Sequence, residues 1–275
     1  MATEESLLSE RDEASRTPAT GLFCGVDVGA SATKLVLIDA AGEVLARAVR
    51  PSGVDYQGTA ALCRDEALQS IGDGRCILRT LSTGYGRKNV DYADRSLTEI
   101  HCHGVACFHL VGGPATLIDI GGQDNKVIRI DASGRRIDFK MNRKCAAGTG
   151  AFLEEIAVRL DLKPAVLDGL ARSATEAARL SSFCTVFAKT EILAHLRAGV
   201  RVESIVLGAF VSVVTRVVEM APLEGRVVLT GGVAEHNPTI ARILSERLGR
   251  TVEVPPHAQF AGALGAALLA REPAS

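Results

Sequence analysis

The chain has 275 residues, a formal net charge of −1 at pH 7 and 47% hydrophobic residues, with few aromatics and no Trp. This length suits one large domain or two of about 130 residues. The near-neutral charge argues against a nucleic-acid-binding surface, and no apolar run reaches the roughly 18 residues of a membrane span.

The first half of the chain alternates short strands with helices. Residues 1–20 are polar and lack the apolar segment of a signal peptide, so we expect a disordered tail and a cytoplasmic protein. With an odd number of cysteines, seven, a disulfide framework is not expected. Gly112-Gly113-Pro114 ends an N-terminal lobe over 21–114. Its predicted elements are strands over 22–28 and 34–38, a helix over 58–70, a strand over 76–81 and a helix over 98–110.

The second half, a C-terminal lobe over 115–275, begins with two more strands and is then mainly helical. Strands followed by helices in each half predict a two-lobed α/β protein. The predicted elements are strands over 116–120 and 126–130, helices over 151–160, 162–172, part of 176–180, 186–196 and 205–220, a strand over 227–229, a helix over 238–248, a strand over 251–254 and a helix over 260–270.

An internal repeat relates the two halves. The segment Asp27–Gly42, DVGASATKLVLIDAAG, returns 92 positions later as Asp119–Gly134, DIGGQDNKVIRIDASG, without a gap and with seven of sixteen positions identical. A repeat of this kind indicates two like-folded halves that face each other. Each copy places an aspartate and a glycine where one strand turns back into the next, so the halves can hold one charged ligand between them.

The residues of each copy suit a phosphate site. Gly29, Gly121 and Gly122 carry no Cβ, so backbone N–H groups can approach an anion closely. Asp27 and Asp119 stand where they can hold the water shell of Mg²⁺, which prefers oxygen ligands. The alternative is two ordinary hairpins with Gly and Asp in their turns; one copy alone favours it, whereas two matched copies favour the phosphate site. The motif is no dinucleotide fingerprint, because it lacks the G-x-G-x-x-G spacing and precedes a strand.

A third element completes the pattern. VVLTGGVAEHN, residues 227–237, is a buried strand followed by Gly231-Gly232 and a helix, which lets a purine or its sugar lie against backbone. In this order the three elements resemble the superfamily of actin, sugar kinases and heat-shock chaperones, whose ribonuclease H-like fold has two duplicated lobes and an interlobe nucleotide cleft. The resemblance implies ATP or ADP with Mg²⁺, held by Asp27, Gly29, Ser31, Thr33, Lys34, Asp119, Gly121, Gly122, Gly231 and Gly232. It implies Gln123 or Asp124 as the residue that orients the attacking water.

Five of the seven cysteines have ordinary explanations. We expect Cys24, Cys63 and Cys76 to be structural residues. Cys102 and Cys107 share the segment EIHCHGVACFHL with three histidines, which raises a zinc site as an alternative. The chain has no Cys-x-x-Cys pair and no second cluster at zinc-finger spacing, so this alternative is weak.

Cys145 and Cys184 differ, because each stands directly before or at the start of a predicted helix. Unpaired N–H groups and partial positive charge at a helix start favour a thiolate or an anionic cluster bound to it. A 4Fe–4S cluster needs four thiolates, and a symmetric dimer would supply two from each copy. The alternative is that both are small buried residues, and residue chemistry alone leaves the two interpretations equal.

A family resemblance favours the cluster. The runs MNRKCAAGTGAFLEEIA, SFCTVFAKTEI, DIGGQDNK, STGYGR, EIHCH and AGALGAALLA resemble the activator ATPases of 2-hydroxyacyl-CoA dehydratases and the related ATPase subunits of class I benzoyl-CoA reductase. The resemblance implies that Cys145 and Cys184 ligate one 4Fe–4S cluster per dimer, in a homodimer or a pair of paralogues. It also implies ATP hydrolysis coupled to transfer of one low-potential electron from a ferredoxin or flavodoxin to an iron–sulfur partner enzyme.

Two other classes use the same fold. A small-molecule kinase would need a substrate pocket with a catalytic aspartate, yet residues 142–200 hold the cysteine helices instead. A non-enzymatic regulator would not need the intact Asp27, Asp119 and Gly231-Gly232. Within the family we prefer the dehydratase activator to the benzoyl-CoA reductase subunit, and we expect neither nucleic acid nor membrane as a partner.

Overall fold

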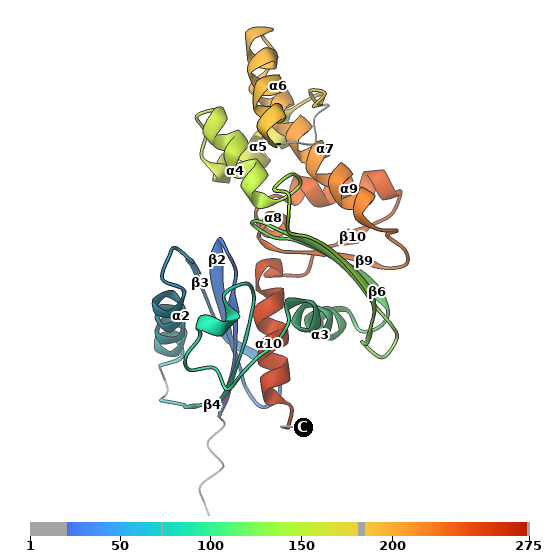
Figure 1. Ribbon diagram of the computed structural model, residues 1–275. Helices are drawn as coiled ribbons and strands as arrows, with labels where there is room; N and C mark the ends of the chain where they lie inside the picture. The colour runs from blue at the N-terminus through green and yellow to red at the C-terminus, as the bar shows by residue number, and fades with distance from the viewer. Residues whose placement is uncertain (1–20, 73, 181–184, 274–275) are drawn as a thin grey trace, which may run out of the picture.

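The computed structural model describes residues 21–72, 74–180 and 185–273 (Figure 1). The predicted tail over 1–20 and the predicted cluster ligand Cys184 lie outside the described residues. None of the helices described is long and apolar enough to cross a membrane.

Two five-stranded sheets form the frame, and both have the same topology. The first has the order β3-β2-β1-β4-β5 and the second β8-β7-β6-β9-β10, each with an antiparallel meander followed by parallel strands. The repeat in sequence is therefore a repeat in structure, and the predicted two-lobed α/β architecture is confirmed. The strands are β1 (Leu22–Val28), β2 (Ala32–Ile38), β3 (Val44–Pro51), β4 (Ile77–Thr83), β5 (Arg95–Ser96), β6 (Ala115–Ile120), β7 (Asn125–Ile130), β8 (Arg136–Asn142), β9 (Val227–Thr230) and β10 (Val252–Glu253).

Helices cover both faces of the first sheet, and the last helix of the chain supplies one of these layers. Helix α2 (Tyr56–Ile71) packs on β2 and β3, whereas α10 (Ala261–Arg271) packs on β1, β2 and β4. Helix α3 (Glu99–Val111) lies between α10 and the second sheet (Figure 1). The division predicted between residues 114 and 115 thus separates the two sheets, while α10 follows the first sheet by packing.

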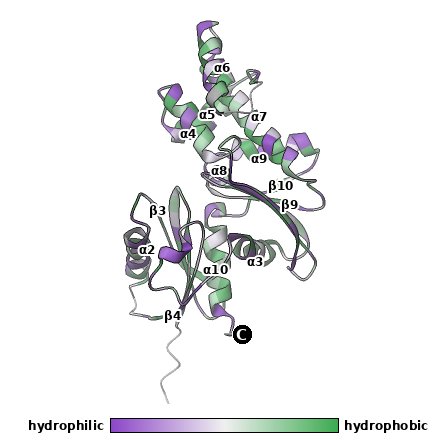
Figure 2. Cartoon of the chain, viewed as in Figure 1, coloured by the Kyte–Doolittle hydropathy of each residue, from purple (hydrophilic) through white to green (hydrophobic). Residues whose placement is uncertain are grey.

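Glycines allow α10 to approach its neighbours closely. A Cβ at Gly265 would fall inside the backbone of Cys102 on α3, and a Cβ at Gly25 would collide with the backbone at Ala263. The helix is almost entirely buried and largely hydrophobic (Figure 2). The Gly/Ala-rich sequence of α10 therefore permits contact between backbones that larger side chains would prevent.

The remaining helices lie beyond the second sheet (Figure 1). The largest hydrophobic core joins Ile118, Ile120 and Val127 of that sheet to these helices. They are α4 (Gly150–Arg159), α5 (Leu167–Ser173), α6 (Thr185–Arg197), α7 (Val202–Met220), α8 (Gly232–His236) and α9 (Pro238–Leu248), with single 3₁₀ turns at Arg87–Asn89, Pro164–Val166 and Ala258–Phe260.

Two local predictions were wrong. Residues 176–180 form no helix, because their backbone groups bond to other elements: Ala178 N donates to Ser204 O at 2.8 Å, and Arg179 O contacts His195 Nε2 at 3.0 Å. Cys76 is exposed, since it precedes β4 instead of lying within it, whereas Cys24 and Cys63 are buried as expected.

Candidate functional site

The first phosphate motif is the hairpin between β1 and β2. Asp27 pairs with Lys34 across the two strands, and their side chains form an ion pair at 3.4 Å. The turn is closed by a hydrogen bond from Gly29 N to Ala32 O at 3.1 Å. Thr33 is fully buried, and its hydroxyl forms a hydrogen bond with the hydroxyl of Ser52 at 2.9 Å. Ser31, at the tip of the loop, is exposed.

The second motif, between β6 and β7, repeats this geometry with more charge. Asp119 pairs with Lys126 across the strands, and Gly121 N donates to Asp124 O at 2.9 Å to close the turn. Lys126 Nζ lies 3.2 Å from Asp119, 2.9 Å from Asp124 and 3.1 Å from Glu99 of α3. A single buried ammonium therefore holds three carboxylates together.

These contacts determine the protonation states of the second motif. Burial alone would raise the pKa of Asp119, but His103, Lys126 and the Thr230 hydroxyl at 2.9 Å hold it well below its usual range. Burial would likewise lower the pKa of Lys126, and its carboxylates hold that pKa above the ordinary value instead. The motif therefore carries an ionised carboxylate that suits a hard cation such as Mg²⁺.

The three predicted nucleotide elements meet. A Cβ at Gly122 would lie only 2.7 Å from the Cβ of Ser31, so the tips of the two phosphate loops touch across the lobes. Gly231 has a φ of +98°, and a Cβ there would collide with the backbone of Ile120. The structure thus brings Gly231-Gly232 directly behind the second loop. Gln123, at the tip of that loop, is exposed, whereas Asp124 is bonded to Lys126.

The Cys145 loop is connected to the second phosphate loop by backbone hydrogen bonds. Gly150 N donates to Gly121 O at 2.9 Å, and Ala151 N donates to Gly122 O at 2.7 Å. The start of α4 is therefore attached directly to the phosphate loop. Cys145 itself is exposed, five residues before that helix start.

Two asparagines, paired across β7 and β8, hold the same loop. Asn125 Nδ2 donates to Gly148 O at 2.7 Å, and Asn142 bonds to both the N–H and the C=O of Cys145. Gly148 adopts a φ of +84°, which favours glycine. The cysteine loop is thus fixed to the end of the sheet that carries the phosphate motif.

Helix α6 lies beside α4. Lys189 of α6 and Glu155 of α4 form an ion pair at 2.7 Å, and Phe152, Ile156 and Ile192 share the largest core. Because α6 begins at Thr185, the residue after Cys184, both cysteine segments lead into helices that pack together. Cys184 itself lies outside the described residues.

Cys102 and Cys107 of α3 are both buried. Burial raises the pKa of Cys102 and Cys107 to about 12, so both remain thiols at neutral pH. Among the described residues, no group of three or more His, Cys, Asp or Glu side chains is arranged to hold a metal ion. The zinc alternative for the EIHCHGVACFHL segment therefore has no support from the geometry.

Sequence reasoning missed several residues of this site. The sequence analysis assigns no role to Lys126, although its identity with Lys34 in the repeat is a usable signal. Glu99, His103 and Thr230 had no such signal, because only the packing of α3 and β9 on the second motif brings them to it.

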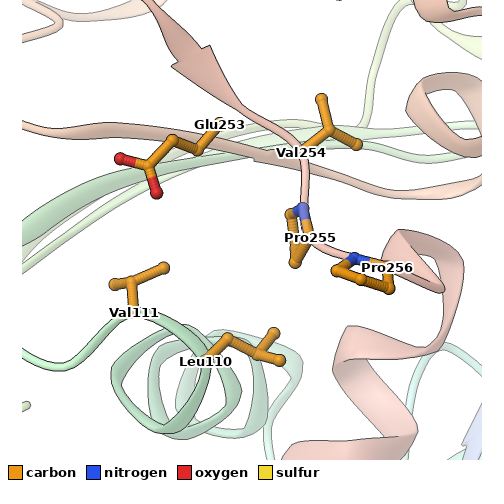
Figure 3. A pocket seen from close by; sticks show the side chains of 6 residues that line it. All are labelled: Leu110, Val111, Glu253, Val254, Pro255 and Pro256. Carbon is orange, nitrogen blue, oxygen red and sulfur yellow. The ribbon is translucent and has the colours of Figure 1, made fainter.

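A separate cavity of about 360 Å³ lies at the opposite end of α3 (Figure 3). Leu110 and Val111 line it on one side, and Glu253–Pro256 line it on the other. Glu253 is paired with Arg226, whose guanidinium also donates to Val111 O. Because Glu99 and His103 lie in the first half of α3, the cavity is not part of the phosphate site.

The phosphate and cysteine elements lie within one family model. The model of the BadF/BadG/BcrA/BcrD ATPase family matches residues 24–270. The chain belongs to this family. The match contains both phosphate motifs, both predicted cluster cysteines and the Gly231-Gly232 element, so the resemblance inferred from the sequence is confirmed.

Relatives and solved structures of similar length agree. The chain is 41% identical to the activator of lactoyl-CoA dehydratase of Anaerotignum propionicum over 254 residues, which are 91% of this chain and 97% of that relative. The crystal structure of Acidaminococcus fermentans (R)-2-hydroxyglutaryl-CoA dehydratase component A has a TM-score of 0.87 at 36% identity, covering 92% of this chain and 98% of that one. The activator of the 2-hydroxyisocaproyl-CoA dehydratase from Clostridium difficile was solved with bound ADPNP. Its structure has a TM-score of 0.86 at 35% identity, and the match covers 91% of this chain and 94% of that one.

More distant structures confirm the fold alone. A ROK family glucokinase from Streptomyces griseus has a TM-score of 0.55 at 14% identity, covering 92% of this chain and all of that one. The actin-like ATPase fold that the resemblance of the three nucleotide elements implies is therefore confirmed.

Proposed function

We propose that this protein is an ATP-dependent activator of a 2-hydroxyacyl-CoA dehydratase. In this function it binds ATP with Mg²⁺ between its lobes and hydrolyses it. It delivers one low-potential electron to the dehydratase from a 4Fe–4S cluster shared by two copies of the chain. The relatives at 35–41% identity whose names describe dehydratase activators support this assignment.

The nucleotide part rests on the meeting of the two phosphate loops. Asp27 and Asp119 can hold the water shell of Mg²⁺, which commonly uses one or two carboxylates together with substrate phosphates. The glycines at 29, 121 and 122 carry no side chain, so phosphate oxygens can approach the backbone of both turns, where the N–H groups of Gly29 and Gly121 already close each turn. Hydrolysis needs mainly positioning and charge stabilisation. Gln123 is better placed than Asp124 to orient the attacking water, because Asp124 is bonded to Lys126.

The electron part rests on the cysteine loop. Cys145 is exposed and lies in a loop of small residues, which fits a thiolate ligand to a cluster at the surface. A bound 4Fe–4S cluster would supply one-electron chemistry at a potential that hydrogen bonds and solvent exposure adjust. Cys184 is the second proposed ligand, and the partner copy would supply the other two. A ferredoxin or flavodoxin would return the electron that the dehydratase removes.

The single observation that carries this proposal is the pair of hydrogen bonds from Gly150 and Ala151 to Gly121 and Gly122. Through them, a change in the phosphate loop displaces the helix that follows Cys145. Nucleotide can drive such a change only by binding one arrangement more tightly than another.

Anaerobic purification tests the proposal. We expect a brown protein with about four iron atoms per dimer, as one 4Fe–4S cluster requires. Cys145→Ser and Cys184→Ser should each remove the visible absorbance, whereas Cys76→Ser, at another exposed cysteine, should keep it. Asp119→Asn should retain iron and lose ATP hydrolysis. A Cys145→Ser protein with its full iron content would contradict the ligand assignment.

Partner assays separate the alternatives. One of the benzoyl-CoA reductase subunits of Thauera aromatica is also a relative, at 24% identity. Electron transfer to a dehydratase, but not to a benzoyl-CoA reductase, is the expected result. A colourless protein that phosphorylates a small molecule would instead be a kinase.

A further inference from the structure

The aspartates of the two phosphate motifs both point towards the helices between the lobes. Successive side chains of a strand alternate between the two faces of its sheet. Asp27 therefore shares the face of Phe23, which packs with α10. Asp119 shares the face of Leu117, which packs with Ile100 and Cys107 of α3. Since α3 and α10 are themselves in contact, the two carboxylates approach the same place from opposite sheets.

His103 of α3 occupies that place. Its side chain is only 7% exposed, and its Nδ1 lies 3.6 Å from Asp119 Oδ1. Nδ1 is buried and makes no hydrogen bond within the described part of the chain. At 3.6 Å the contact is longer than a hydrogen bond, so a small approach of α3 to β6 would complete one.

The opposite edge of the ring faces the first motif. A Cβ at Gly262 of α10 would lie 3.1 Å from His103 Nε2 and 2.9 Å from Asp27 Oδ2. The imidazole and the Asp27 carboxylate therefore border the same small space. That space exists because residue 262 has no side chain. One histidine thus touches the second phosphate motif and adjoins the first.

The donor and acceptor pattern indicates what this space can take. In the tautomer that places a proton on Nδ1, towards the Asp119 carboxylate, Nε2 is an acceptor. Asp27 is also an acceptor, and two acceptors do not bond to each other. A molecule with two donor hydrogens fits between them. A water of a hydrated Mg²⁺ ion is such a molecule, because Mg²⁺ keeps several waters when it binds to proteins.

We propose that His103 is a positioning residue of the Mg²⁺–nucleotide site. Its Nδ1 edge fixes Asp119, and its Nε2 edge orients a metal-bound water beside Asp27. This inference rests on the proposed function. It gives the histidine of the EIHCHGVACFHL segment a role that zinc binding does not explain.

The test measures ADP binding to the full chain by calorimetry at increasing Mg²⁺ concentrations. Loss of a residue that orients a metal ligand typically lowers metal affinity by about 10–100-fold. We expect His103→Ala to raise the half-saturating Mg²⁺ concentration by about tenfold or more, with ADP affinity in EDTA unchanged. His101→Ala is the matched control, because His101 is exposed on the same helix.

Two polar variants keep the test decisive if alanine destabilises the fold. The amide of His103→Gln reaches the position of Nε2, whereas that of His103→Asn reaches only the position of Nδ1. Glutamine should therefore preserve the Mg²⁺ response better than asparagine. Equal Mg²⁺ responses of His103→Ala and His101→Ala, or rescue by asparagine and not by glutamine, would overturn the inference. A wild-type protein whose ADP binding ignores Mg²⁺ would overturn the proposed function and this inference with it.

Discussion

The buried charges around Lys126 make a quantitative prediction about stability. Lys126→Met removes the ammonium that three carboxylates contact, while the side chains of Lys126 and Asp119 are both only 4% exposed. Removing one partner of a buried ion pair typically costs about 3–5 kcal/mol, because the other charge stays buried without compensation. We expect Lys126→Met to lower the free energy of unfolding by this amount at pH 7.

The internal repeat provides a matched control. Lys34 occupies the same position in the first motif, but it is 17% exposed and has one carboxylate partner, at 3.4 Å. Because a single, longer contact is lost, we expect Lys34→Met to lower the free energy of unfolding by less than Lys126→Met, even though Asp27 is itself only 9% exposed. Methionine keeps the apolar stem at both positions, so the difference between the variants reports the charge.

Urea unfolding followed by circular dichroism measures the effect in protein without nucleotide or cluster. With a slope of about 3 kcal/mol per M, the midpoint should fall by about 1 M or more for Lys126→Met and by a smaller amount for Lys34→Met. The pKa of Asp119 is lower in the folded state than in the unfolded state. The charged carboxylate therefore stabilises the fold above the unfolded pKa of about 4, and this stabilisation is lost at lower pH. The difference between wild type and Lys126→Met should therefore persist from pH 7 to about 4 and shrink as the pH falls further. Equal midpoint shifts for the two lysines, or a difference that does not change with pH, would refute the reasoning.

Three further predictions concern packing and the cysteine loop. Gly265→Ala should lower the free energy of unfolding by about 1–3 kcal/mol, because its Cβ would overpack the contact with α3. Gly169→Ala lies in a helix with open space around the Cβ, so it should raise the free energy of unfolding by up to about 1 kcal/mol. Midpoints of urea unfolding measure both effects. Alkylation at pH 8 in cluster-free protein should label Cys76 and Cys145 but spare the four buried thiols, whose pKa burial raises to about 11 or 12; mass spectrometry identifies the sites. Asn125→Ala should make the labelling rate of Cys145 insensitive to an ATP analogue that changes this rate in the wild type, and an unchanged nucleotide effect would contradict a coupling role for that side chain.

Much of the fold could be predicted because the sequence contains an internal repeat of the same strand pair. Asp27 and Lys34 recur as Asp119 and Lys126 at the same spacing of seven, which an antiparallel hairpin places opposite each other. The spacing of apolar residues within short segments predicts most of the strands and helices, because this periodicity depends only on neighbouring residues. The helix expected within 176–180 failed because the hydrogen bonds of that segment go to residues far along the chain.

The site was harder to predict where packing alone assembles it. His103 lies about 160 residues before Gly262 in the chain, and only the contact between α3 and α10 makes them neighbours. Nothing in the local pattern distinguishes His103 from the exposed His101. Family resemblance indicated the cysteines, whereas the hydrogen bonds that join their loop to the phosphate motif became visible only in three dimensions.

The path of the C-terminal helix has a consequence for synthesis. The eleven residues of α10 leave the ribosome well after those of β1, yet they pack on one face of that strand. The first sheet therefore keeps that face uncovered until α10 has been synthesised, a state prone to aggregation. In a protein terminated before Ala261, that face of the first sheet would remain uncovered.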